Sequence, residues 1–219
     1  MKLDLSEPLR YLGVRGEPDP ALYPEISAVA DRLTRAVEPR YIYRVFPLTF
    51  REEGPALEGT GLTLTGEMAG HMLADCAQAV LLACTLGAGF ETMLRAEQAR
   101  SMARAAMLDA CGSAWVEAGC DEAEEEISAR FPGLYRTDRF SPGYGDLPLE
   151  LQRDICALLD AQRRLGVQVT DSLLMNPTKS VTAIIGLSEN LQPARIRGCS
   201  CCALREHCQY RKEGKTCGA

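Results

Sequence analysis

The stretch AVLLACTLG, Ala79 to Gly87, is the most informative part of the sequence for the fold, because it is apolar and ends in glycine. A short apolar run of this kind is typical of a buried strand. Two further segments predict strands: SVTAIIGLS, Ser180 to Ser188, and the aromatic and β-branched RYIYRVFPLTF, Arg40 to Phe50. Because Pro47 cannot donate a hydrogen bond to a neighbouring strand, we expect the Arg40 strand toward an edge of its sheet.

Helical periodicity predicts the other elements. Apolar residues recur every three or four positions from Leu22 to Val37, which indicates one amphipathic helix. A second helix is predicted from Leu151, with an apolar face at Leu151, Ile155, Leu158 and Leu159 and a stop at Gly166. The pattern from Phe90 to Phe131 is also helical, but Gly112 and Gly119 interrupt it, and each costs about 1 kcal/mol relative to alanine. We expect a kink or break near one of these glycines, or close packing of another backbone there.

Composition restricts the class of protein. The chain has 219 residues, enough for one large domain or two small ones. Hydrophobic residues make up 46% and charged residues 25%, which excludes a wholly disordered chain, a collagen and a coiled-coil rod. The net charge of -6 argues against nucleic acid as the main partner, because phosphate binding relies on a surplus of lysine and arginine.

The sequence contains no evident targeting or membrane segment. Charged residues interrupt the N-terminal MKLDLSEPLRYLG, so no secretory signal is predicted. The longest uncharged stretch, Cys76 to Phe90, is too short for a membrane-spanning helix, which needs about 20 residues. We therefore expect a soluble, cytoplasmic protein that has no membrane partner.

The ten cysteines fall into two groups. In a reducing cytosol, core packing, metal binding or redox chemistry explains cysteines better than disulfides do. Five lie singly within apolar patterns and are predicted to be small buried hydrophobic residues: Cys76, Cys84, Cys111, Cys120 and Cys156. The other five crowd into the C-terminal segment: Cys199, Cys201, Cys202, Cys208 and Cys217.

The C-terminal cysteines predict a separate region. We divide the chain into a folded domain, residues 1–195, and a cysteine-rich basic tail, residues 196–219. Four thiolates that begin with a CxxC pair are the predicted ligands of a zinc ion or an iron–sulfur cluster: Cys199, Cys202, Cys208 and Cys217. His207 could replace one thiolate, and the spacing does not choose between the metals. The alternative is a disordered tail whose cysteines oxidise in handling.

A long loop holds the candidate ligand site. Residues Phe131 to Pro148 contain too much glycine and proline for regular structure, and long loops in compact domains are often functional. Arg139 offers a planar fork of donors suited to a carboxylate, and Gly143 lets the backbone approach a ligand closely. Tyr144 supplies a flat face for stacking and a hydroxyl group. Together they suit a small ligand with a carboxylate and a planar base; the alternative is a loop whose arginine binds backbone carbonyls.

Other catalytic motifs are absent from the sequence. The TLGAG turn, Thr85 to Gly89, lacks a full GxGxxG pattern and is predicted to be structural. His71 and His207 are the only histidines, and no HExxH motif, Ser-His-Asp set or Walker loop occurs, which argues against a triad hydrolase or a zinc protease. Without the glycine motif and a regular alternation of strands and helices, a conventional Rossmann-type methyltransferase is also disfavoured.

Several segments together resemble one known family. RFSPGY, Arg139 to Tyr144, is similar to the RxxxGY signature of the activation domain of cobalamin-dependent methionine synthase. Glu117 matches a glutamate that this family uses for ligand binding. A further set resembles the family's turn, methionine, proline and strand start: Val169 to Ser172, Met175, Pro177, Ser180 and Val181. The resemblance covers about Ala79 to Ser188 and implies an α+β fold, a bent antiparallel sheet with packed helices.

The resemblance also implies a function and a binding site. The family binds S-adenosylmethionine, whose methyl group, together with one electron, returns oxidised cob(II)alamin to methylcobalamin. Arg139 would pair with the carboxylate of S-adenosylmethionine, and Glu117 would interact with its ammonium group or its sulfonium charge. Gly143 would let the backbone reach the ligand, and Tyr144 would line it. No side chain is expected to act as a catalytic acid or base.

The same resemblance implies partners. The sequence has no DxHxxG motif for cobalamin, so we expect the cobalamin on a partner, a corrinoid-dependent methionine synthase or a related corrinoid protein. An electron donor protein is a further expected partner. The alternative hypothesis is a metal-binding or iron–sulfur module that transfers electrons to a corrinoid protein or docks on it.

Overall fold

The computed structural model describes residues 1–14, 19–194, 206–207 and 209–212. Its contacts divide the chain into two compact units. The first unit comprises Met1–Tyr43, Leu82–Ile127 and Gln152–Thr182. The second unit comprises Arg44–Leu81, Ser128–Leu151 and Ala183–Ala219. The proposed boundary at residue 195 stays a prediction, because residues 195–205 lie outside the described part.

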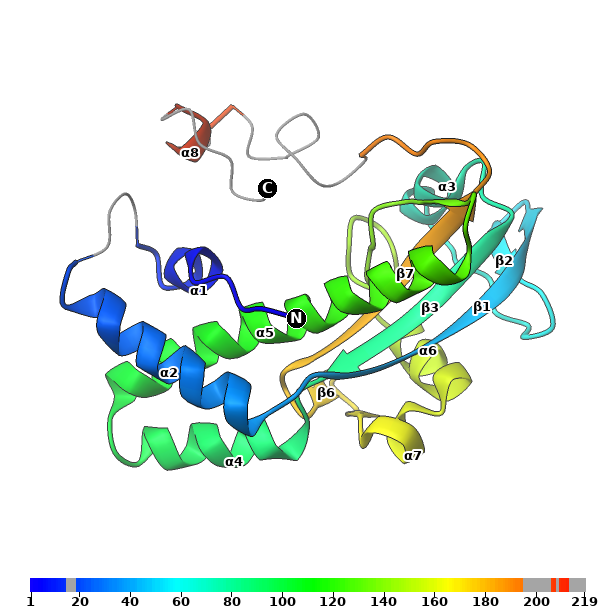
Figure 1. Cartoon of the computed structure of the whole chain (residues 1–219). Coiled ribbons are helices and arrows are strands. Elements are labelled where there is room, and N and C mark those ends of the chain that lie inside the picture. Colours follow the sequence, from blue (N-terminus) through cyan, green and yellow to red (C-terminus); the bar gives the residue numbers. More distant parts are fainter. Residues whose placement is uncertain (15–18, 195–205, 208, 213–219) are drawn as a thin grey trace. The chain divides into compact units, whose positions relative to one another are not determined.

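The strands form one five-stranded sheet in the order β2-β1-β3-β7-β4, and Figure 1 labels its long strands β1, β3 and β7. Its members are β1 (Arg40–Arg51), β2 (Gly54–Leu57), β3 (Gln78–Thr85), β4 (Tyr135–Arg136) and β7 (Ser180–Ser188). A separate antiparallel pair consists of β5 (Gln168–Val169) and β6 (Met175–Asn176). The strands predicted at Arg40, Ala79 and Ser180 are therefore present, and β3 is buried along nearly its whole length, as its apolar sequence predicts.

The expectation that Pro47 places its strand toward a sheet edge is wrong. β1 lies between β2 and β3, so it is an interior strand. Its pairing with β2 begins at Leu48, opposite Leu57, and the carbonyl of Pro47 accepts only the N–H of Glu58, at 3.0 Å, beyond the end of β2. In a strand, the N–H and the carbonyl of one residue point to the same side. At Pro47 that side faces the region where β2 has already ended, so the missing N–H of the proline removes no hydrogen bond between β1 and β2.

Helices occupy both units. The first unit contains α1 (Ser6–Tyr11), α2 (Leu22–Ala36), α4 (Gly87–Gln98), most of α5 (Met102–Arg130), α6 (Leu151–Leu159) and α7 (Ala161–Leu165). The second unit contains α3 (Glu67–Leu73) and the short α8 (Gln209–Lys212). The amphipathic helix predicted from Leu22 is α2, which buries Ile26, Val29 and Leu33 as its spacing indicates. Among the described helices, none is long and apolar enough to cross a membrane.

The predicted break near Gly112 or Gly119 is not observed, because α5 runs unbroken through both positions. The helical conformation is interrupted earlier, between the end of α4 at Gln98 and the start of α5 at Met102. There the hydroxyl oxygen of Ser101 accepts the N–H of Arg104 at 3.3 Å and caps α5. Close packing does occur at both glycines, but against side chains and not against another backbone as expected. A Cβ added at Gly112 would meet the Phe90 ring at 2.4 Å, and one at Gly119 would meet Pro39 at 2.5 Å.

The five cysteines within apolar patterns are buried, as predicted. Two of them pack against glycines: the Cys84 sulfur lies 2.9 Å from the position that a Cβ at Gly119 would take, and the Cys76 sulfur lies 2.5 Å from that position at Gly186. Burial raises the pKa of the Cys111 thiol to about 12 and that of Cys156 to about 11. Both thiols are therefore protonated and unreactive near neutral pH.

This burial predicts slow alkylation. In the native protein at pH 8, Cys111 and Cys156 should react with iodoacetamide at least about tenfold more slowly than after denaturation. The reagent does not reach the buried sulfur atoms, and the raised pKa values keep both thiols protonated, whereas the thiolate is the reactive form. Mass spectrometry of the two tryptic peptides measures this. Equal labelling of native and denatured protein would show that these side chains are not held in a packed interior.

Candidate functional site

The candidate ligand loop lies in the second unit, between α5 and α6. Apart from the two-residue strand β4, residues 131–148 have no regular strand or helix, as predicted. Phe140 is fully buried and exchanges two backbone hydrogen bonds with Ile184 of β7, at 3.0 and 2.7 Å. Arg139 directly precedes this anchor and is 8% exposed. The start of the loop is therefore held against the sheet with the arginine in a fixed place.

A tight turn follows the anchor. The N–H of Gly143 donates to the carbonyl of Leu147 at 2.9 Å, and the N–H of Leu147 donates to the carbonyl of Tyr144 at 2.9 Å. Gly143 has a φ of +89°, a conformation that favours glycine. Leu147 is buried, whereas Tyr144 is 49% exposed. The turn thus presents an open backbone and an aromatic face four and five positions after the buried Arg139.

The turn is also attached to the first turn of α3. The carboxylate of Asp146 accepts the N–H of Glu67 at 2.6 Å and the N–H of Met68 at 2.9 Å. These bonds hold the pKa of Asp146 below its ordinary value. The sequence analysis did not single out Asp146, because its partners lie 79 and 78 residues earlier in the chain and no local pattern marks the pairing.

Glu117 belongs to the first unit, where it lies half-buried on α5. The pKa of Tyr11, at the end of α1, is raised chiefly by burial, while Arg10 lowers it and the negative charge of Glu117 raises it. Of the four predicted ligand residues, the structure therefore brings Arg139, Gly143 and Tyr144 together on one loop. Glu117 stands on a helix of the other unit and remains a candidate there.

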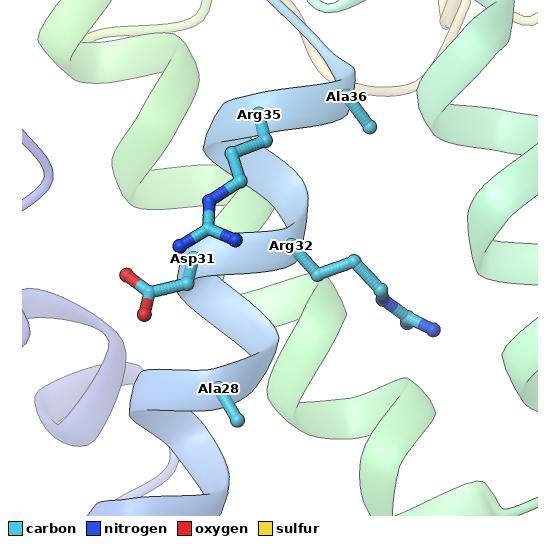
Figure 2. Close-up of a pocket in the computed structure, with 5 residues that line it drawn as sticks. All are labelled: Ala28, Asp31, Arg32, Arg35 and Ala36. Carbon is cyan, nitrogen blue, oxygen red and sulfur yellow. The ribbon is translucent and has the colours of Figure 1, made fainter.

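Two surface hollows in the first unit contain none of the predicted ligand residues. One, of about 460 Å³, follows α2 along Ala28, Asp31, Arg32, Arg35 and Ala36. Figure 2 shows that Arg32 and Arg35 extend toward opposite sides of this helix, so their guanidinium groups do not converge on one ligand. The other, of about 360 Å³, lies between α6, α7 and β5, where Arg153 already donates to the carbonyls of Thr170 and Asp171.

The predicted metal ligands Cys199, Cys202, Cys208 and Cys217 lie outside the described residues. Within the described ranges, no group of three or more histidine, cysteine, aspartate or glutamate side chains is placed to hold a metal ion.

Antiparallel strands and packed helices define an α+β domain, and its candidate ligand loop has a buried arginine and an exposed tyrosine. The family described as "Vitamin B12 dependent methionine synthase, activation domain" matches residues 83–193. The chain belongs to this family, which confirms the predicted family and, with it, a role in activating the cobalamin-dependent methionine synthase.

Comparison with solved structures confirms the predicted α+β fold. The crystal structure of the MetH reactivation domain bound to AdoHcy superposes with a TM-score of 0.62 and 16% sequence identity. The match covers 97% of this chain and 82% of that chain. No curated protein matches the sequence.

Proposed function

We propose that this chain binds S-adenosylmethionine and presents it for the reductive remethylation of cobalamin held by a partner, a corrinoid-dependent methionine synthase or a related methyltransferase. The family supports the reaction, and the AdoHcy in the similar MetH reactivation domain supports the ligand, because AdoHcy is S-adenosylmethionine without its methyl group. An electron donor protein is the further partner that reduction requires.

One observation carries the proposal: the RxxxGY loop buries Arg139 and then forms a turn that exposes Gly143 and Tyr144. A guanidinium group in this position suits the ligand carboxylate, since its planar donors match two carboxylate oxygens. The open backbone at Gly143 admits a close approach, and the exposed ring of Tyr144 offers a stacking face for the planar base. Glu117 is the proposed partner of the ligand ammonium group or sulfonium charge.

The donor set fits S-adenosylmethionine, which supplies the activated methyl group through its sulfonium. The residues of this chain bind and orient the ligand. None of the proposed ligand residues needs to take or give a proton, so Arg139 and Glu117 act through their charges and hydrogen bonds.

Titration calorimetry tests the proposal. S-adenosylmethionine should bind the wild-type chain, and Arg139→Ala should raise the Kd at least about tenfold, because a charge-assisted pair with the carboxylate is lost. Arg139→Lys should bind with intermediate affinity, since it keeps the charge and loses the fork.

Arg136→Ala is the matched control. It removes an arginine from the same loop, one that donates to Ser128 at 2.6 Å, and should leave the Kd unchanged. Thermal melting of each variant verifies folding. An unchanged Kd in folded Arg139→Ala would remove this arginine from the site, and a wild-type chain that does not bind would contradict the proposed function.

A further inference from the structure

The ligand loop and α3 meet at contacts that involve side chains on both segments. Both carboxylate oxygens of Asp146 accept hydrogen bonds from the first turn of α3: Oδ2 from the N–H of Glu67 and Oδ1 from the N–H of Met68. A carboxylate at the N-terminus of a helix is favourable, because the N–H groups there lack partners within the helix. Since Asp146 lies between Tyr144 and Leu147, this contact fixes the exposed part of the turn.

Two glycines permit this contact. A Cβ at Gly66, which precedes α3 and has a φ of +102°, would lie 2.9 Å from the carbonyl oxygen and from Oδ1 of Asp146. A Cβ at Gly145 would lie 2.8 Å from the terminal methyl group of Met68. At Gly66 the close atoms include the backbone oxygen of Asp146, so a side chain there would push the loop away from α3. At Gly145 the end of the Met68 side chain could move aside, but the φ of +57° favours glycine.

We propose that Asp146 is a positioning residue of the S-adenosylmethionine site, which holds Gly143 and Tyr144 in their binding conformation by tying the turn to α3. This inference rests on the proposed function. Phe140 anchors the start of the loop to β7 and the buried Leu147 anchors its end, while Asp146 anchors the segment between them. A turn held in advance loses less conformational freedom when the ligand binds, which strengthens binding without a direct contact.

Hydrogen exchange of the ligand-free protein tests the positioning itself. In Asp146→Ala, the amides of Glu67 and Met68 lose their acceptors, and the bonded amides of Gly143 and Leu147 should also exchange at least about tenfold faster. Gly66→Ala keeps the carboxylate but displaces it, and should have the same effect. Unchanged protection of Gly143 and Leu147 in both variants would overturn the proposal whether or not the ligand binds.

Calorimetry then tests the consequence for the ligand. Asp146→Ala should weaken S-adenosylmethionine binding about three- to tenfold at a temperature where the variant is fully folded, and Asp146→Asn, which keeps one acceptor, should recover part of the loss. Glu150→Ala removes an exposed carboxylate from the same region and should change neither exchange nor Kd.

The two proposals fail in different ways. A lower melting temperature with an unchanged Kd would reduce Asp146 to a structural role and overturn the positioning. A wild-type chain that does not bind S-adenosylmethionine would contradict the proposed function and with it the ligand assigned to Asp146, while the exchange experiment still decides whether Asp146 holds the turn.

Discussion

Replacing Phe90 with alanine should lower the free energy of unfolding by about 3–5 kcal/mol. Phe90 is fully buried on α4, and its ring occupies the space that a side chain at Gly112 of α5 would otherwise need. Truncation removes buried apolar surface and leaves a cavity between two long helices. Denaturant unfolding of the wild type and the variant measures the difference.

The same contact predicts that the effect of Gly112→Ala on stability has opposite signs in the wild type and in Phe90→Ala. In the wild-type chain, Gly112→Ala places a Cβ 2.4 Å from ring atoms of Phe90, and overpacking of this kind costs about 1–3 kcal/mol. In the Phe90→Ala background the ring is gone, so Gly112→Ala should instead stabilise by about 1 kcal/mol, the helix preference for alanine over glycine.

A double-mutant cycle over the four proteins gives the coupling between the two positions. If Gly112→Ala has the same effect in both backgrounds, the ring and the glycine are not in contact, and the explanation for the unbroken helix α5 is wrong.

Replacing Glu97 with glutamine should destabilise the first unit by about 1–3 kcal/mol. Glu97 is 3% exposed and accepts from Arg32 at 2.5 Å, with Arg104 3.5 Å from its other oxygen. Both arginines are partly exposed, which keeps the effect below that of a fully buried pair. The Nε and Nη2 atoms of Arg32 are buried without partners among the described residues, so the bond to Glu97 is important for this side chain.

The effect of Glu97 should depend on pH. The hydrogen bond from Arg32 is the main cause that holds the pKa of Glu97 below its ordinary value, although burial opposes it. A carboxylate with a lowered pKa stabilises the folded state above the unfolded-state pKa, and this contribution is lost as the pH falls through the folded-state pKa. Below about pH 4.5, the wild type should therefore lose stability more steeply than Glu97→Gln.

Urea unfolding between pH 3 and pH 7 measures this difference. Glu38→Gln, which removes an exposed carboxylate, serves as the control and should follow the wild type. If Glu97→Gln and the wild type lose stability in parallel on acidification, the ionised carboxylate of Glu97 does not contribute to folding.

Elements whose pattern is complete within a short segment were predictable from the sequence. The apolar run at Ala79 predicts β3, the spacing from Leu22 predicts α2, and the segment from Ser180 predicts β7. Each follows from a local rule, because burial on both faces requires an apolar run and burial of one helix face requires apolar residues three or four positions apart. The RxxxGY segment likewise indicated a ligand loop and the family that the comparison confirms.

Features that depend on distant neighbours were decided by the tertiary structure. Gly112 indicated a break because glycine is a poor helix former, yet α5 is continuous, since the Phe90 ring fills the place of the missing side chain. Pro47 indicated an edge strand, yet β1 is interior, since β2 ends where the proline lacks its N–H. The attachment of Asp146 to α3 joins residues that are 79 positions apart.

The sequence alone thus determined the strands β1, β3 and β7 and the helix α2, which loop carries the candidate ligand residues, and the family of this protein. The tertiary structure decided that α5 tolerates Gly112, that β1 tolerates Pro47, and that Asp146 attaches the ligand loop to α3. The physical reason is one of distance along the chain: periodicity records whether a residue faces the core, but not which distant side chain or backbone group fills the space beside it.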